Sequence, residues 1–147
     1  MLKEETRWNI ALVSHDNKKK DLLEWAEYNK NVLKEHNLFG TGTTGTLIED
    51  RLGLKVHKYK SGPLGGDAQI IAAIVEERID MLIFFWDGLT SHPHDVDVKA
   101  LLRNAVNYNI PVACNRASAD FFISSPLLEA GYKDKHTMPV FSERIEY

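Results

Sequence analysis

The sequence has one cysteine, no long apolar run and no surplus of basic residues. Cys114 alone excludes a disulfide within the chain, and no apolar run approaches the roughly 20 residues of a membrane-spanning helix. The N-terminal segment contains no apolar signal core. With 18 Lys and Arg against 21 Asp and Glu, the net charge of -3 argues against the broad basic face that nucleic-acid binding needs. We therefore expect a cytoplasmic protein that neither crosses a membrane nor binds nucleic acid, and that holds any anionic ligand with local donors.

The overall composition is that of an ordinary globular protein. Hydrophobic residues make up 44% of the 147 residues and charged residues 27%. A chain of this length buries roughly 70% of its unfolded surface, which is enough for one core. We expect residues 1–147 to form a single domain, in which Cys114 ends a β-branched run and is a buried structural thiol rather than a nucleophile.

Short apolar runs alternate with longer segments of helical periodicity along the chain. The pattern predicts strands at residues 10–13, 37–40, 56–59, 81–86 and 111–114, and helices at residues 19–35, 47–52, 68–77, 96–108 and near 120. Repeated strand–helix units indicate an α/β fold: a three-layer sandwich with a mainly parallel, five-stranded, Rossmann-like sheet. The run from 81 to 85 is apolar throughout, as in a central strand, whereas 56–59 is more polar and is expected near an edge.

Polar or glycine-rich residues follow every predicted strand. They are Ser14, His15 and Asp16 after the first, residues 41–45 (TGTTG) after the second, residues 61–67 (SGPLGGD) after the third, residues 86–87 and 92–98 (HPHDVDV) after the fourth, and Asn115 after the fifth. The carboxyl ends of parallel strands share one edge of the sheet, where ligands bind. The sequence therefore predicts one site built from several loops.

Two of these loops are typical of anion binding. In TGTTG, glycines allow close approach of the backbone, hydroxyl groups donate, and the following helix N-terminus presents free N–H groups. A turn with a threonine N-cap is the alternative, although it explains only one of the three threonines. SGPLGGD is a second glycine-rich turn, and it ends in Asp67, which on spacing alone is either a functional carboxylate or a helix N-cap.

The HPHDVDV segment brings two histidines close to acidic residues. His94 and Asp97 are three residues apart, so they project from nearly the same face if a helix has begun there. A zinc site is the alternative, but no cysteine and no further His-x-x-His element completes a ligand set. We expect no bound metal, and we interpret His92 as structural.

Taken together, these segments resemble the methylglyoxal synthase family. The matching blocks are ALVSHD followed by Lys19, then TGTTG, SGPLGGD, IFFWD, PHDVDVKALLR and NIPVACN, in that order from about residue 10 to 122. The resemblance implies a lyase that converts dihydroxyacetone phosphate to methylglyoxal and inorganic phosphate through an enediolate, with no cofactor. A non-catalytic effector-binding module, similar to the allosteric domain of carbamoyl phosphate synthetase, is the alternative within the same fold.

The resemblance also implies a role for each matching residue. Asp67 is the expected catalytic base, His94 and Asp97 assist proton movement, and His15 and Asp16 lie at the floor of the site. Asp87 orients its neighbours. The residues expected at the substrate phosphate are Lys19, Thr41, Gly42, Thr43, Thr44, Ser61 and Gly62.

Assembly and regulation follow from the resemblance alone. It implies a homohexamer that inorganic phosphate inhibits, and Trp8 and Trp25 are candidates for surface residues at a subunit interface. The matching weakens toward the C-terminus, where Arg144 is a candidate for an arginine that contributes to the phosphate region in some members.

Overall fold

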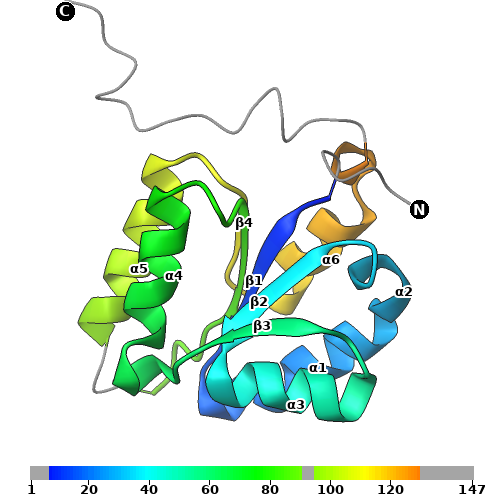
Figure 1. Ribbon diagram of the computed structural model, residues 1–147, viewed down its shortest axis with the longest axis horizontal. Coiled ribbons are helices and arrows are strands. Elements are labelled where there is room, and N and C mark those ends of the chain that lie inside the picture. Colours follow the sequence, from blue (N-terminus) through cyan, green and yellow to red (C-terminus); the bar gives the residue numbers. More distant parts are fainter. Residues whose placement is uncertain (1–6, 91–94, 130–147) are drawn as a thin grey trace, which may run out of the picture.

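The computed structural model describes residues 7–90 and 95–129, with backbone only at 95–97, and its strands form one parallel sheet in the order β3-β2-β1-β4-β5 (Figure 1). The strands are β1 (Asn9–Ser14), β2 (Asn37–Thr41), β3 (Val56–Tyr59), β4 (Met81–Phe85) and β5 (Val112–Ala113). Each strand lies where an apolar run predicted one. The order reverses at β1, because β2 and β3 extend to one side of it and β4 and β5 to the other.

Helices cover both faces of this sheet. They are α1 (Lys19–Tyr28), α2 (Lys30–Leu33), α3 (Gly42–Leu52), α4 (Gly66–Val75), α5 (Asp95–Asn107) and α6 (Arg116–Ser124), with 3-10 turns η2 (Asp16–Lys18), η3 (Gly62–Leu64) and η4 (Pro126–Leu128). Helices α4 and α5 lie on one face, and α1, α3 and α6 lie on the other (Figure 1). The predicted three-layer α/β sandwich is confirmed.

Strand β1 shows how the sequence builds two cores from one sheet. Successive side chains of a strand point to opposite faces. Ile10 and Leu12 pack in the core under α1 and α3, whereas Ala11 and Val13 pack in the core under α4 and α5. All five residues of β4 are buried, as predicted for a central strand. Strand β3 lies at an edge, also as predicted, and exposes His57 and Lys58.

One predicted helix is interrupted. The expected helix 19–35 is broken at Asn29, whose backbone leaves helical geometry at φ -101° and ψ 17°. Both the backbone N–H and the side-chain amide of Asn29 donate to the carbonyl of Trp25, at 3.1 and 2.9 Å. Asparagine side chains compete for backbone groups in this way, and the competition ends α1 before the short α2 begins.

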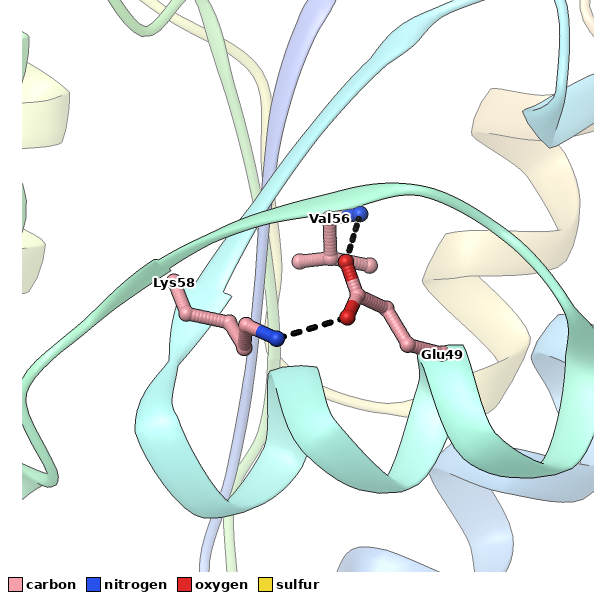
Figure 2. A network of polar contacts seen from close by, with 3 residues as sticks. All are labelled: Glu49, Val56 and Lys58. Atoms are coloured by element: carbon pink, nitrogen blue, oxygen red, sulfur yellow. Dashed lines mark hydrogen bonds and ion pairs between the residues drawn. The ribbon is translucent and has the colours of Figure 1, made fainter.

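Helix α3 starts earlier than predicted. The expected start was residue 47, but the TGTTG segment itself forms the first turn from Gly42. This turn packs against β3 so closely that a Cβ at Gly45 would lie 2.6 Å from Lys58 Cγ. Farther along α3, Glu49 accepts from the backbone N–H of Val56 at 2.9 Å and from Lys58 Nζ at 2.6 Å (Figure 2). Glycine and threonine are weak helix formers, so the close packing of this first turn against β3, rather than local propensity, explains why α3 starts at Gly42.

The tryptophans proposed for a subunit interface are buried, and that prediction is wrong. Trp8 and Trp25 are 2% and 1% exposed. Each indole N–H also has an internal acceptor: Trp8 donates to the carbonyl of Leu128 at 2.8 Å and Trp25 to Asp120 at 3.1 Å. These side chains anchor α1, α6 and η4 to the sheet. Within the described ranges, no helix has the length and apolar character needed to cross a membrane.

Candidate active site

A pocket of about 280 Å³ lies at the carboxyl ends of the strands, where the strand order reverses. Its walls come from the carboxyl ends of β1 and β2, from the segments that follow β1, β2 and β3, and from a side chain of β4. The lining residues are Val13, Ser14, His15, Asp16, Lys19, Thr41, Thr43, Ser61, Gly62, Pro63, Asp67 and Phe84. The switch point of a parallel sheet is the usual position of a ligand site. The pocket lining includes Asp67 and seven other predicted site residues.

Asp67 lies in the first turn of α4 and is only 3% exposed. The turn before it is fixed by backbone contact: the N–H of Gly66 donates to the carbonyl of Ser61 at 2.9 Å, and a Cβ at Gly66 would lie 1.9 Å from the carbonyl oxygen of Lys60. Gly65, with φ 105°, is the N-cap of α4. Asp67 is thus not the N-cap, and the alternative that made it a simple cap is wrong.

Gly62 borders the Asp67 carboxylate. A Cβ placed on Gly62 would lie 3.5 Å from both Asp67 Oδ1 and Oδ2. The glycine therefore leaves space beside the carboxylate, on a wall that Ser61 and Gly62 share with the pocket. A small ligand can approach the carboxylate through this space.

The N-terminus of α3 faces the same pocket. Thr41 is the N-cap residue, and its side chain makes no capping hydrogen bond, so the first N–H groups of the helix keep their donor capacity. Thr41 and Thr43 line the pocket. Gly42 and Thr44 do not line it: Gly42 packs toward the carbonyl of Tyr59, and Thr44 is 2% exposed. The backbone of this turn is an anion-binding element, with a helix dipole that favours negative charge.

A lysine provides positive charge beside these amides. Lys19 Nζ pairs with Asp16 Oδ1 at 2.6 Å, one turn apart along the chain. The Asp16 side chain is 96% exposed, whereas that of Lys19 is 20% exposed. Both residues line the pocket. Asp16 therefore holds the Lys19 ammonium group at the edge of the pocket, where an incoming anion can also pair with it.

His15 is a buried member of the lining. It is 5% exposed and packs edge-on against Phe84, with ring centroids 5.1 Å apart. Its Nδ1 accepts a hydrogen bond from the backbone N–H of Asp87 at 2.9 Å. Asp87 is itself buried and does not line the pocket, and its orienting role stays a prediction. The Asp87 carboxylate accepts from Leu89 N–H at 3.1 Å and from Asn17 Nδ2 at 2.9 Å.

Several lining residues lie in segments that the sequence assigned to the site or to the sheet, but they were given no role of their own. Ser14 lines the pocket, and its hydroxyl oxygen is buried with no hydrogen-bond partner within the described ranges. Its place at the end of β1 was the available signal. Phe84 and Pro63 also contribute, but an apolar strand and a turn give no hint of which residues face a pocket.

The remaining predicted residues are only partly placed. His94 and Arg144 lie outside the described residues, as does His92, and Asp97 is placed only as a residue of the first turn of α5. Among the side chains that the structure describes, no group of three or more His, Cys, Asp or Glu residues is arranged to hold a metal ion. Cys114 is half-buried away from this pocket, and burial raises the pKa of its thiol.

Comparison with known proteins identifies the family to which this arrangement belongs. Residues 21–114 match the model of the MGS-like domain. The chain belongs to the MGS-like family. The match runs from α1 to the residue after β5, so it includes TGTTG, SGPLGGD and all of α5.

Several relatives of this MGS-like chain are named methylglyoxal synthase. The protein of Clostridium acetobutylicum is 54% identical over 134 residues, which cover 91% of this chain and 92% of that protein. The protein of Cellvibrio japonicus is 60% identical over 117 residues, covering 80% of this chain and 76% of that one. The crystal structure of methylglyoxal synthase from Elizabethkingia anophelis matches with a TM-score of 0.81 at 52% identity, covering 84% of this chain and 82% of that chain.

Proposed function

We propose that this MGS-like protein is a methylglyoxal synthase, a carbon–oxygen lyase that converts dihydroxyacetone phosphate to methylglyoxal and inorganic phosphate. The observation that carries the proposal is the shared pocket of the buried Asp67 carboxylate and the N-terminus of α3. A base and an anion-binding element within one small cavity suit a substrate that carries an acidic C–H group and a phosphate. The identity of 54% and 60% to relatives named methylglyoxal synthase supports the same assignment.

The reaction begins with proton transfer to Asp67. The carboxylate takes a proton from the hydroxymethyl carbon beside the ketone, and the C–H electron pair moves into a new C=C bond while the carbonyl oxygen becomes negative. Burial disfavours the charged form of a carboxylate and so makes it a stronger base. The space beside Gly62 allows the substrate carbon to reach the carboxylate.

The enediolate then expels phosphate. A proton moves from the hydroxyl oxygen of the former hydroxymethyl carbon to the former carbonyl oxygen, the electron pair left on the first oxygen forms a new carbonyl at its carbon, the C=C pair shifts toward the phosphate-bearing carbon, and the C–O bond to phosphate breaks. The resulting enol takes up a proton at its methylene carbon, which replaces the proton that Asp67 removed, and passes its hydroxyl proton to the released phosphate to become methylglyoxal. Expulsion requires that the C–O bond stand perpendicular to the enediolate plane, because only then does it overlap the π system.

The phosphate-binding residues set this angle in the proposed mechanism. The N–H groups after Thr41, the hydroxyl groups of Thr43 and Ser61 and the Lys19 ammonium group hold the phosphate while its charge grows. His15 provides a donor near the developing oxyanion. His94 donates to the enediolate oxygens and moves a proton between them, and Asp97 orients the His94 ring. Each step is assigned to side chains and backbone amides of the chain, and none is assigned to a cofactor.

The direct test is incubation of the purified protein with dihydroxyacetone phosphate. We expect methylglyoxal and inorganic phosphate to form in equal amounts, measured by derivatisation of the dicarbonyl and by a phosphate assay on the same samples. Formation of glyceraldehyde phosphate without release of phosphate would instead assign an isomerase. Binding of inorganic phosphate with the substrate left intact would favour the effector-binding module.

A further inference from the structure

Two loops that lie 70 residues apart in the sequence are joined by a hydrogen bond between side chains. Asn17, in the 3-10 turn after β1, donates from Nδ2 to Asp87 Oδ2 at 2.9 Å. Asp87 follows β4, and its other carboxylate oxygen accepts from the N–H of Leu89 at 3.1 Å. The buried Asp87 side chain therefore fixes the loop after β4 and is itself held by the loop after β1.

The backbone of Asp87 determines the protonation of His15. The N–H of Asp87 donates to His15 Nδ1 at 2.9 Å, so this nitrogen is an acceptor and carries no hydrogen. An imidazole with a bare Nδ1 carries its hydrogen on Nε2. The N–H of His15 also donates to the carbonyl of Phe85 at 3.2 Å, which fixes the backbone beneath the ring. His15 is thereby a neutral ring with Nε2–H as its donor.

We propose that Asn17 is a positioning residue for the reaction: by holding the Asp87 carboxylate, it keeps the Asp87 amide aimed at His15 and so maintains the Nε2–H form of that ring. The inference rests on the proposed function for its consequence in turnover. The contact path is Asn17 to Asp87 to His15, and only the last of these lines the pocket. Asn17 acts without touching the substrate.

The chemistry of the contact explains why an amide is suited to this position. A carboxylate accepts hydrogen bonds and an asparagine amide donates them without adding charge beside Lys19 and Asp16. Replacement by aspartate would keep the size but place two carboxylates where the donor and acceptor now stand 2.9 Å apart. Replacement by alanine would remove the donor and leave no repulsion. Asn17→Ala therefore reports loss of the hydrogen bond, and Asn17→Asp reports its replacement by repulsion between two carboxylates.

The test compares Asn17→Ala and Asn17→Asp with wild type in steady-state kinetics and in histidine side-chain NMR. We expect kcat to fall roughly 10-fold in Asn17→Ala and further, up to roughly 100-fold, in Asn17→Asp, because a displaced catalytic group costs rate on this scale. Inhibition by inorganic phosphate should change less than about twofold, because Asn17 lies outside the phosphate-binding residues. Asn31→Ala and Asn31→Asp, at an exposed position of α2, are the matched controls and should leave kcat unchanged.

NMR provides the readout that does not depend on turnover. Correlation of ring protons with ring nitrogens, with His15 assigned through the missing signals of His15→Gln, should show an Nε2–H ring in wild type and a mixture in Asn17→Asp. An unchanged His15 ring in both Asn17 variants, or kcat within about twofold of wild type in both, would overturn the positioning role. A wild-type protein that makes no methylglyoxal would instead overturn the proposed function, while the NMR comparison still decides the role of Asn17.

Discussion

Asp67 is the residue on which the proposed chemistry depends, because it is the buried carboxylate of the pocket. Asp67→Asn should fold and bind inorganic phosphate, but its turnover should fall by roughly three orders of magnitude or more, since an amide does not accept the proton. Asp80→Asn is a suitable comparison. Asp80 is also buried, and it accepts from the N–H of Asn9 at 2.8 Å away from this pocket, so its loss should lower the melting temperature and spare kcat. Near-normal kcat in Asp67→Asn would remove the assigned base.

Gly62 matters for the space that it leaves. Gly62→Ala would put a methyl group 3.5 Å from both carboxylate oxygens of Asp67, an ordinary contact that the fold tolerates. The methyl group would occupy the approach to the base, and we expect kcat/KM to fall by roughly 10- to 100-fold with little change in melting temperature. Gly66→Ala should behave differently, because its Cβ would collide with the carbonyl oxygen of Lys60, and the expected result is loss of stability. Thermal unfolding and steady-state kinetics on both variants distinguish the two effects.

Among the elements, α3 and β3 are joined by the Glu49 contacts drawn in Figure 2. The hydrogen bond from Lys58, with a further one from the backbone of Val56, lowers the pKa of Glu49 below its ordinary 4.5. A lowered pKa in the folded state contributes stability that is present above the unfolded value and is lost as the pH falls through the folded value. Glu49→Gln should therefore lower the urea midpoint slightly at pH 7, and the difference from wild type should shrink as the pH falls below 4.5 and through the lowered pKa of the folded state.

The control for this pair is Glu27→Gln, an exposed position of α1. It should show no comparable difference in urea midpoint at either pH. Because the Glu49 and Lys58 side chains are 29% and 40% exposed, added salt should reduce the effect of Glu49→Gln. An effect that persists unchanged in acid would mean that the carboxylate charge does not contribute.

The strands could be predicted from sequence far better than the helix ends. A strand buried on both faces is a continuous apolar run, and 81–85 shows it directly. The break at Asn29 and the early start of α3 depend on interactions that periodicity does not report: a side chain competing for backbone groups, and glycines that let a helical turn lie against β3. Local propensity is a weak guide wherever tertiary contacts determine where a helix begins or ends.

At the scale of the whole molecule, topology explains why the site could be anticipated. His15 follows β1, Thr41 ends β2, and Ser61 and Asp67 follow β3. Parallel strands bring their carboxyl ends to one edge of the sheet. The sequence did not reveal which residues of these loops are buried behind the pocket surface or which loops contact each other. Thr44 is buried rather than lining the pocket, and the bond between Asn17 and Asp87 joins loops that no local pattern relates.

Assembly remains a prediction for the intact protein. Because Trp8 and Trp25 are in the core, an interface must use other residues, and large apolar side chains such as Phe121 and Val106 are 79% and 70% exposed. A homohexamer of 16.7 kDa chains should give a particle of roughly 100 kDa by light scattering. Inorganic phosphate should inhibit turnover without changing that mass. A monomeric mass at micromolar concentration would contradict the predicted assembly.

The half-buried thiol of Cys114 has a consequence for the survival of an enzyme that performs the proposed reaction. Methylglyoxal adds to sulfur through its aldehyde carbon, and the species that attacks it is the thiolate. Because burial raises the pKa of Cys114, the thiolate fraction at neutral pH is smaller than that of an exposed cysteine. Burial of this thiol beside β5 therefore slows adduct formation by the dicarbonyl that the proposed reaction releases.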